Sequence, residues 1–281
     1  MTLLTLILFL FSSLSLAEQF QAPVTNTQWQ VIESPLECSL SQTIDGYGSA
    51  MFSRRSGEDI SLVFTTKTQP SVAGLAHFEI AQAPWQNSDQ RQILLSVSTK
   101  NNQTQFNLTG DLAKQALTHI QEGRFPVLRY RSQSSSTDIS VLFSTVHLSD
   151  SMPAFEQCLE NLHPDTFADI QKLTIYFSLE DASLSDDAKG FLTRIADYVK
   201  IDDSVKRVSI SGHTDNHGRR RLNIPLSEAR ALAIKNYFID VCQLDESIIT
   251  TSFHREFLPS KSNKTQTGRA HNRRAEIEVF R

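Results

Sequence analysis

Apolar residues recur at every second position through the first half of the chain. Between Glu18 and Ser149, short β-branched or aromatic runs alternate with turn-forming residues; the clearest cover residues 61–65, 77–80, 93–97, 105–108, 127–131 and 138–143. A period of two is typical of strands. Only the segment from Asp111 to Gln121 departs from it, with apolar residues at helical spacing. The pattern predicts an all-β domain over residues 18–150 that contains one helix.

The pattern changes after residue 150. Pro153, Pro164 and their polar neighbours indicate a linker over residues 151–164. Beyond it, strands predicted at 173–177, 205–211, 250–256 and 275–280 alternate with helices. One helix is capped by Ser185, and another runs from Ser227 to about Cys242. This alternation predicts an α/β sandwich over residues 165–281, and the chain as a whole is α+β in class.

Composition excludes several classes of protein. The 281 residues are 40% apolar and 21% charged, with 10 Gly and 9 Pro, which is a globular balance and not that of a disordered or collagenous chain. The formal net charge of −4 argues against a dedicated nucleic-acid binder, which needs a basic excess. We expect no nucleic-acid partner.

The N-terminus is predicted to be an export signal. Leu3 to Leu16 is an apolar and hydroxyl-bearing run, too short for a transmembrane helix. Ser15 and Ala17 are small residues suited to cleavage before Glu18, so residues 1–17 form the predicted signal peptide. The segment before the run has no Lys or Arg, which leaves an uncleaved anchor as the alternative. Because position 18 is not Cys, we expect an unlipidated periplasmic protein without a transmembrane segment in its mature form.

The chain has three cysteines, an odd number for an exported protein. Cys38 and Cys158 lie near the two ends of the first predicted domain, and a disulfide between them would close a long loop. Cys242, at the end of a helical pattern, reads as a small buried hydrophobe. We expect the Cys38–Cys158 disulfide; free thiols or another pairing are the alternatives.

The chemistry is concentrated between Ser209 and Ala231. A predicted strand places Gly212 to Asp215 at its C-terminal end, and the next helix is predicted to begin at Ser227, with Arg230 in its first turn. A guanidinium in a first turn calls for an anion, and its planar fork fits a carboxylate. Asp215, on the same rim, would accept an ammonium group. The pair predicts a site for a ligand that carries both charges on one carbon.

Two other interpretations of these residues stay open. In the first, Asp215 and Arg230 pair only with each other, as a structural salt bridge. The second is a metal site. His213, Asp215 and His217 alternate as metal ligands do on a strand. However, Gly212 and Gly218 bracket the segment as a loop, where alternation no longer fixes direction. We therefore expect no metal and no cofactor.

The second domain resembles the OmpA-like domain family. The resemblance rests on four pieces in order: Gly212-His213-Thr214-Asp215, Asn223, Leu226-Ser227-x-x-Arg230-Ala231 and Asn272-Arg273-Arg274. It implies a mixed sheet with helices on one face, and non-covalent binding of peptidoglycan through the diaminopimelate of its stem peptide. By the same resemblance, Asp215 takes the amino group, Arg230 the carboxylate, and Thr214 lines the pocket. Asn223 supports the loop or the ligand, and Arg273 is a further candidate. Ser178 departs from the family, which commonly has Asp there.

The first domain resembles the MotY family of sodium-driven polar flagellar motors. Trp29, the segment from Ser34 to Leu40 and the segment from Ile44 to Phe52 carry this resemblance. It implies a periplasmic ring around the basal body, built with a partner called MotX, that holds the stator units while the second domain binds the wall. A generic wall-tethering envelope protein is the alternative. An enzyme is not expected, because no Cys and His or Ser and His arrangement has a recognisable catalytic spacing.

Overall fold

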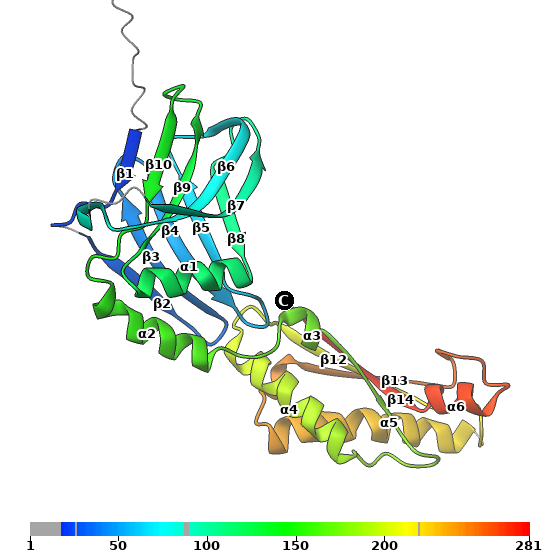
Figure 1. The fold of residues 1–281 in the computed structure, drawn as a ribbon. Coiled ribbons are helices and arrows are strands. Elements are labelled where there is room, and N and C mark those ends of the chain that lie inside the picture. The colour runs from blue at the N-terminus through cyan, green and yellow to red at the C-terminus, as the bar shows by residue number, and fades with distance from the viewer. Residues whose placement is uncertain (1–17, 26, 87–89, 219) are drawn as a thin grey trace, which may run out of the picture. The chain divides into compact units, whose positions relative to one another are not determined.

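The computed structural model describes residues 18–25, 27–86, 90–218 and 220–281. The predicted signal peptide, residues 1–17, lies outside the described residues. The chain divides into two units, the first ending at Leu162 and the second beginning at His163 (Figure 1). No helix among the described residues has the length and apolarity needed to cross a membrane.

The first unit is built on two five-stranded sheets (Figure 1). One sheet has the order β1-β10-β9-β6-β7 and the other β2-β3-β4-β5-β8. The pairing is antiparallel except between β1 and β10. The strands are β1 (Glu18–Gln21), β2 (Trp29–Glu33), β3 (Glu37–Ile44), β4 (Gly48–Arg55), β5 (Ser61–Thr66), β6 (Ser71–Ala81), β7 (Arg91–Thr99), β8 (Gln105–Thr109), β9 (Phe125–Ser132) and β10 (Asp138–Leu142).

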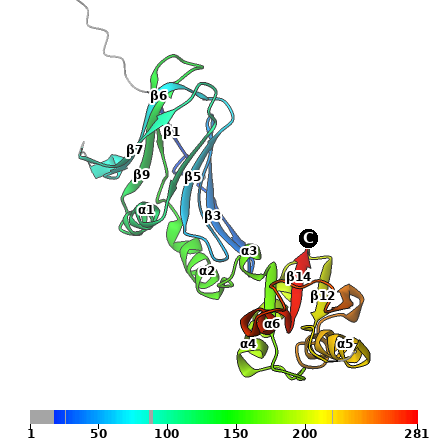
Figure 2. The same cartoon turned by 90° about the vertical axis from the view of Figure 1, so that its right-hand side faces the viewer.

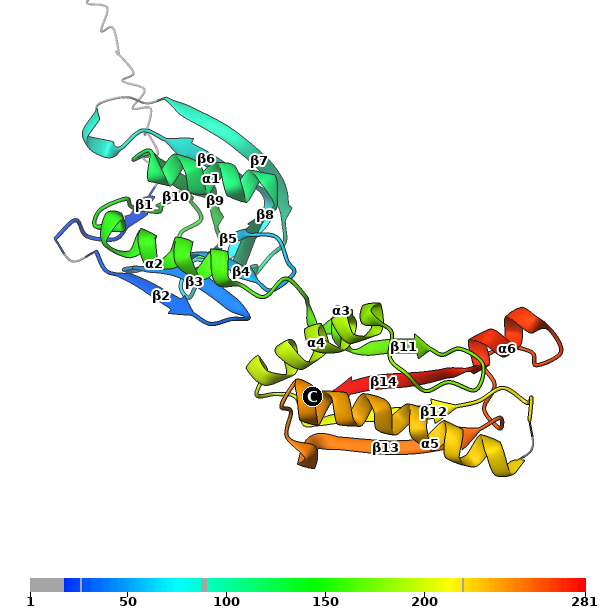
Figure 3. The same cartoon turned by 90° about the horizontal axis from the view of Figure 1, so that it is seen from below.

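Two helices complete the core of this unit. They are α1 (Asp111–Gln121), with the predicted bounds, and α2 (Leu148–Asn161); a short 3-10 turn, η1, covers Pro84–Gln86. Figure 3 shows α1 and α2 side by side against the sheets. Both helices and both sheets contribute to one buried cluster, which includes Phe52, Phe78, Ile120 and Phe155. The alternating apolar positions of the sequence are therefore the inward-facing positions of a sandwich.

Most of the predicted linker is helix. α2 covers much of residues 151–164 and contains Pro153, the residue that suggested a boundary. Its buried residues, Leu148, Met152, Phe155 and Cys158, form one apolar face that packs in the core of the first unit. The break between the units follows the helix, at Leu162 and His163. Burial of this face outweighs the helix-breaking tendency of a single proline.

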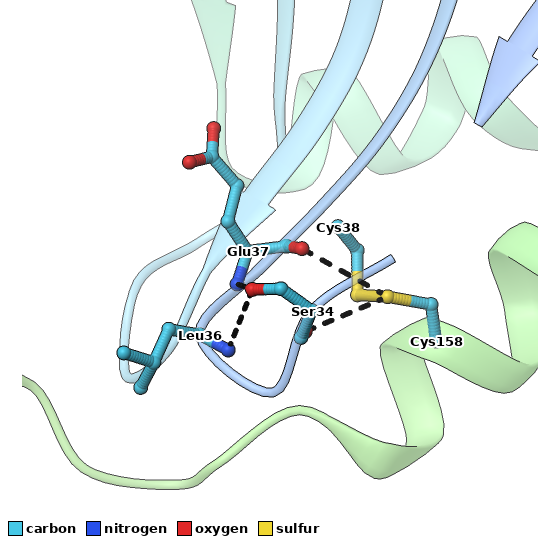
Figure 4. The surroundings of a disulfide bond; sticks show 5 residues. All are labelled: Ser34, Leu36, Glu37, Cys38 and Cys158. Atoms are coloured by element: carbon cyan, nitrogen blue, oxygen red, sulfur yellow. Dashed lines mark hydrogen bonds between the residues drawn. A yellow bond between two sulfur atoms is a disulfide. The ribbon is translucent and has the colours of Figure 1, made fainter. Parts of the chain in front are cut away.

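A disulfide fastens α2 to β3. Cys38 and Cys158 are bonded, with Cα atoms 5.8 Å apart, as the sequence led us to expect (Figure 4). The turn before β3 is held by Ser34, whose Oγ accepts hydrogen bonds from the backbone N–H groups of Leu36 and Glu37 at 3.1 and 3.0 Å. Cys242 is a buried free thiol, and burial raises its pKa. The disulfide closes a loop that spans nearly the whole first unit.

The second unit is a four-stranded mixed sheet with helices packed on it (Figure 2). Its order is β11-β14-β12-β13, with β12 and β13 parallel and the other pairs antiparallel. The strands are β11 (Lys172–Tyr176), β12 (Arg207–His213), β13 (Ile249–Arg255) and β14 (Arg274–Phe280). The helices are α3 (Phe167–Ile170), α4 (Asp186–Ile201), α5 (Arg220–Asn236) and α6 (Gln266–Asn272), with short segments η2 (Tyr237–Val241) and η3 (Glu246–Ile248).

The helices α4 and α5 lie on the same side of this sheet (Figure 2). Ser185 caps α4 as predicted, since its Oγ accepts a hydrogen bond from the N–H of Ala188 at 3.2 Å. The start of α5 was predicted wrongly: the helix begins at Arg220 and contains Pro225, so Arg230 lies in its middle. The interpretation of Arg230 as a first-turn cation is therefore wrong, and its electrostatics must come from tertiary contacts.

One glycine sets how closely α5 approaches β12. A Cβ atom on Gly212 would lie 2.0 Å from the carbonyl oxygen of Ser227, a distance that no side chain tolerates. Only glycine lets the helix backbone lie this near the strand. This close packing brings the middle of α5 beside the C-terminal end of β12, where the candidate residues lie.

Candidate functional site

The five residues predicted to bind ligand line one pocket. Its volume is about 430 Å³, and its walls include Thr214, Asp215, Asn223, Arg230 and Arg273. They come from the loop directly after β12, from α5 and from the residue after α6. Sequence reasoning missed other wall residues, which lie in the loops after β11 and β12 and in the first turns of α5: Leu179, Glu180, His217, Gly218, Leu222, Pro225 and Leu226. Because the helix was predicted to begin only at Ser227, Leu222 and Leu226 lay outside its periodic pattern and were not linked to the site.

Arg230 is fully buried and held by main-chain carbonyls. Its Nη1 donates to the oxygen of His213 at 2.7 Å, its Nε to that of Asp181 at 2.9 Å, and its Nη2 to that of Ser178 at 3.2 Å. The guanidinium also lies 5.1 Å from the centre of the Phe177 ring. Burial lowers the pKa of Arg230 to about 10, with Asp215 opposing this shift and Arg273 adding to it. Arg230 therefore stays a cation at neutral pH, in a position fixed by the fold.

Asp215 pairs with Arg273 and not with Arg230. Its Oδ2 accepts a hydrogen bond from Nη1 of Arg273 at 3.0 Å, and its Oδ1 accepts one from the N–H of His217 at 2.9 Å. Arg273 is fixed in turn, because its Nε donates to the carbonyl of Phe177 at 3.2 Å. The buried carboxylate is thus oriented by a tight turn and by a second cation. The simple salt bridge between Asp215 and Arg230 is not what holds these residues.

Thr214 and Asn223 differ in their roles. Thr214 is 2% exposed, and within the described part of the chain its Oγ1 has no hydrogen-bond partner. A buried hydroxyl without a partner is costly, so its position on the pocket wall suits a group that a ligand satisfies. Asn223 is also buried, and its Nδ2 donates to the carbonyl of Asp215 and to Oε2 of Glu256, both at 3.4 Å. Asn223 therefore supports the loop that carries Asp215.

The consecutive residues Asn272, Arg273 and Arg274 have three separate tasks. The buried amide of Asn272 bonds the backbone of Lys261 in both directions, at 2.8 and 3.0 Å, and so fastens the loop before α6. Arg273 turns into the pocket. Arg274, at the start of β14, donates to Glu276 at 2.6 Å and to the carbonyl of Leu258 at 3.1 Å. Of this motif, only Arg273 lines the pocket.

The pocket combines balanced charge with an apolar wall. Arg230 and Arg273 supply two positive charges, and Asp215 and Glu180 supply two negative ones. Leu179, Leu222, Pro225 and Leu226 provide the apolar surface. Such walls suit a small ligand with both a cationic and an anionic group on an aliphatic chain. Among the described residues, no cluster of His, Cys, Asp and Glu side chains is arranged to hold a metal ion.

Two protein families match successive parts of the chain. Residues 20–164 match the MotY N-terminal domain, and residues 176–273 match the OmpA family. The first match covers about half of the chain and coincides with the β-rich unit. The second includes every pocket-lining residue, from Leu179 to Arg273.

Individual relatives agree with this division. The sodium-type flagellar protein MotY of Vibrio parahaemolyticus is 28% identical over 95% of this chain and 92% of its own length. The peptidoglycan-binding protein ArfA of Mycobacterium tuberculosis is 39% identical, but over 37% of this chain and 32% of its own length. Outer membrane protein A of Bordetella avium is 30% identical over 46% of this chain and 66% of its own length.

Solved structures resemble part of the chain. The cell wall anchor of the T6SS from Pseudomonas aeruginosa is 32% identical over 39% of this chain and 80% of its own, with a TM-score of 0.34. The C-terminal domain of Helicobacter pylori MotB is 20% identical over 39% of this chain and 84% of its own, with a TM-score of 0.36.

Proposed function

Because the chain belongs to the MotY family and carries an OmpA family domain, we propose that it is a non-catalytic flagellar motor component that anchors the motor to the cell wall. In this proposal the second unit binds the diaminopimelate stem peptide of peptidoglycan in the periplasm. The first unit binds a MotX-like ring partner, the basal body and the stator proteins. The proposal joins the family relationship to the chemistry of one pocket.

The observation that carries the wall-binding proposal is the convergence of separated residues on a single cavity. Asp215, Arg230 and Arg273 come from distant parts of the sequence, yet all three line it. Diaminopimelate ends in a carbon that bears an amino group and a carboxylate. Its carboxylate would meet the Arg230 guanidinium, its amino group would meet Asp215, and Thr214 Oγ1 would gain a hydrogen bond. The aliphatic chain would lie against the leucines of the wall.

The test is co-sedimentation of the full chain with purified peptidoglycan. We expect Asp215→Asn to remove most pelleting, since an ammonium left unpaired in a partly desolvated pocket costs about 2–5 kcal/mol. Arg230→Ala should have the same effect, but Arg230 also holds three carbonyls, so its folding must be checked by circular dichroism. Asp186→Asn is the matched control. This substitution removes the same charge, but from an exposed carboxylate on α4.

Two results would count against the proposal. Undiminished pelleting of Asp215→Asn and of folded Arg230→Ala would refute the site. Release of soluble muropeptides by the wild-type protein would instead indicate a wall hydrolase.

The motor role is tested separately in cells. A strain that lacks the protein should assemble flagella that fail to rotate, and Asp215→Asn should restore motility poorly although the protein is present in the periplasm. Normal swimming of the deletion strain would favour the alternative, a generic envelope tether to peptidoglycan.

A further inference from the structure

A second pocket adjoins the candidate wall-binding site. Its volume is about 380 Å³, and it is lined by Tyr176, Phe177, Ser178, Thr267, Ala270, His271 and Arg273. These residues come from the end of β11, the loop that follows it, and α6 with its next residue. None of the functions assigned above uses Tyr176 or His271.

The two pockets share one wall. Arg273 lines both, and the segment from Tyr176 to Glu180 lines them in succession: Tyr176 to Ser178 the second pocket, Leu179 and Glu180 the first. Because Arg273 belongs to both walls, the pockets are adjacent, and a short peptide that passes Arg273 contacts both. Arg273 lies at the boundary that such a peptide would cross.

Arg273 is well placed to hold a group in the second pocket as well. Its Nε donates to the carbonyl of Phe177, and the Phe177 N–H donates back to the Arg273 carbonyl at 2.8 Å. Within the described residues, the hydrogen bonds of its guanidinium are the one to Phe177 and the one to Asp215. A guanidinium has five N–H donors, so donors remain for a ligand.

The chemistry of the second pocket favours an anion. The ionisable residues among its lining are Arg273, His271 and Tyr176, and none of the lining side chains is a carboxylate. Tyr176 is 56% exposed, and its ring meets the His271 ring edge-on, with the ring centres 5.5 Å apart. A cation, an imidazole and a phenol around one cavity present hydrogen-bond donors to a carboxylate. The first pocket, in contrast, has balanced charges.

We propose that the second pocket is a subsite for the acidic peptide residue that adjoins diaminopimelate, with Arg273 and His271 binding its free carboxylate. The inference rests on the proposed function, because it assumes that diaminopimelate occupies the first pocket. In a stem peptide the neighbour of diaminopimelate is a γ-linked D-glutamate, whose α-carboxylate is free unless it is amidated. The subsite would therefore distinguish walls with free D-glutamate from walls with the amidated residue.

The test compares three small ligands by calorimetric titration of the full chain. They are meso-diaminopimelate, γ-D-glutamyl-meso-diaminopimelate, and the same dipeptide with its glutamate α-carboxylate amidated. We expect the acidic dipeptide to bind about tenfold more tightly than diaminopimelate, the scale of one charge-assisted hydrogen bond. The amidated dipeptide should lose most of this gain.

Variants locate the gain in the second pocket. His271→Ala and Tyr176→Ala should reduce the affinity for the acidic dipeptide to nearly that for diaminopimelate, while changing diaminopimelate binding less than twofold. Tyr176→Phe should keep the ring packing. Phe191 is an exposed aromatic residue on α4 that lines neither pocket, so Phe191→Ala should leave the affinity for all three ligands unchanged.

The outcomes separate this inference from the proposed function. Equal affinity for the acidic and amidated dipeptides would overturn the subsite, as would a gain that survives in both alanine variants, even if diaminopimelate binds normally. Absence of diaminopimelate binding would overturn the proposed function, and the subsite with it.

Discussion

At the scale of single residues, replacing the buried Thr214 hydroxyl should affect ligand binding and stability differently. Its Oγ1 has no partner among the described residues, so Thr214→Val should leave the free energy of unfolding unchanged or raise it by up to about 1 kcal/mol. The same variant should weaken diaminopimelate binding, because the ligand loses a hydrogen bond. Urea unfolding and calorimetric titration measure the two effects.

A second threonine in the same unit provides the contrast. Thr265 caps α6, with its Oγ1 accepting the N–H of Gly268 at 3.0 Å. Thr265→Val should therefore destabilise the unit by about 1 kcal/mol. If Thr214→Val were equally destabilising, the hydroxyl would have a structural role, and its assignment to the ligand would be lost.

Replacement by alanine should have opposite effects on stability at two glycines of the second unit. Gly212→Ala should destabilise the second unit by about 1–3 kcal/mol, since the new methyl group meets the Ser227 carbonyl and displaces α5 from β12. Gly190, within α4, has open space around its Cα, so Gly190→Ala should stabilise the unit by about 0.5–1 kcal/mol. Thermal unfolding followed by circular dichroism checks both. A tolerated Gly212→Ala would show that the close helix packing is not required.

The sequence predicted which residues meet at the site better than how they meet. Residue types and their order pointed to Asp215 and Arg230, and the resemblance to the OmpA-like family added Arg273; all three line the pocket. The pairing of Asp215 with Arg273 could not be predicted, because it depends on where β14 and the end of α6 are placed by the whole sheet. The main-chain carbonyls that bind Arg230 could not be predicted either, because every residue has a carbonyl and the sequence does not show which ones face the guanidinium.

At the scale of elements, two of the errors in the predicted helices involve an internal proline. α2 contains Pro153 and α5 contains Pro225, and each was taken to lie outside a helix. Local rules give proline a cost of about 3 kcal/mol inside a helix. The apolar face of α2, which ends in the disulfide, and the packing of α5 against Gly212 offset this cost. Where no such conflict arose, the prediction agrees with the structure: α1 has the predicted bounds, and α4 begins after the predicted cap, Ser185.

Three strands of the second unit surround His213 and make stability depend on pH. His213 is 2% exposed; its ring centre lies 5.2 Å from that of His254, and a carboxylate oxygen of Glu276 lies 4.0 Å from its Nε2. Burial, with the nearby charge of Arg274, lowers the pKa of His213 to about 4, against 6.5 in the unfolded chain, although Glu276 opposes the shift. The neutral ring is favoured in the folded state.

The sign of the effect follows from linkage. Because the unfolded state binds the proton more readily, stability is fully present above pH 6.5 and falls as the pH decreases from 6.5 towards 4, by about 3 kcal/mol in total. Urea unfolding of wild type and His213→Gln across this range measures it. We expect the variant to lose most of the pH dependence, whereas an equal slope in both proteins would assign the effect to other groups.

At the scale of the whole molecule, the disulfide should act on one unit and leave the other unchanged. Cys38 and Cys158, 120 residues apart, are joined within the first unit, and its main core cluster lies within the same stretch of chain. Removing a long loop closure typically costs about 2–5 kcal/mol. The two tryptophans of the sequence, Trp29 and Trp85, both belong to the first unit, so tryptophan fluorescence reports its unfolding alone.

We therefore expect the Cys38→Ser, Cys158→Ser double variant to shift the fluorescence transition to lower urea concentration. Circular dichroism, which also detects α4 and α5, should show a second transition at the wild-type position. Cys242→Ser is the control, because this thiol is free and lies in the second unit. If both transitions moved together in the double variant, the units would unfold as one cooperative body. The disulfide would then stabilise the wall-binding pocket as well as the β-sandwich.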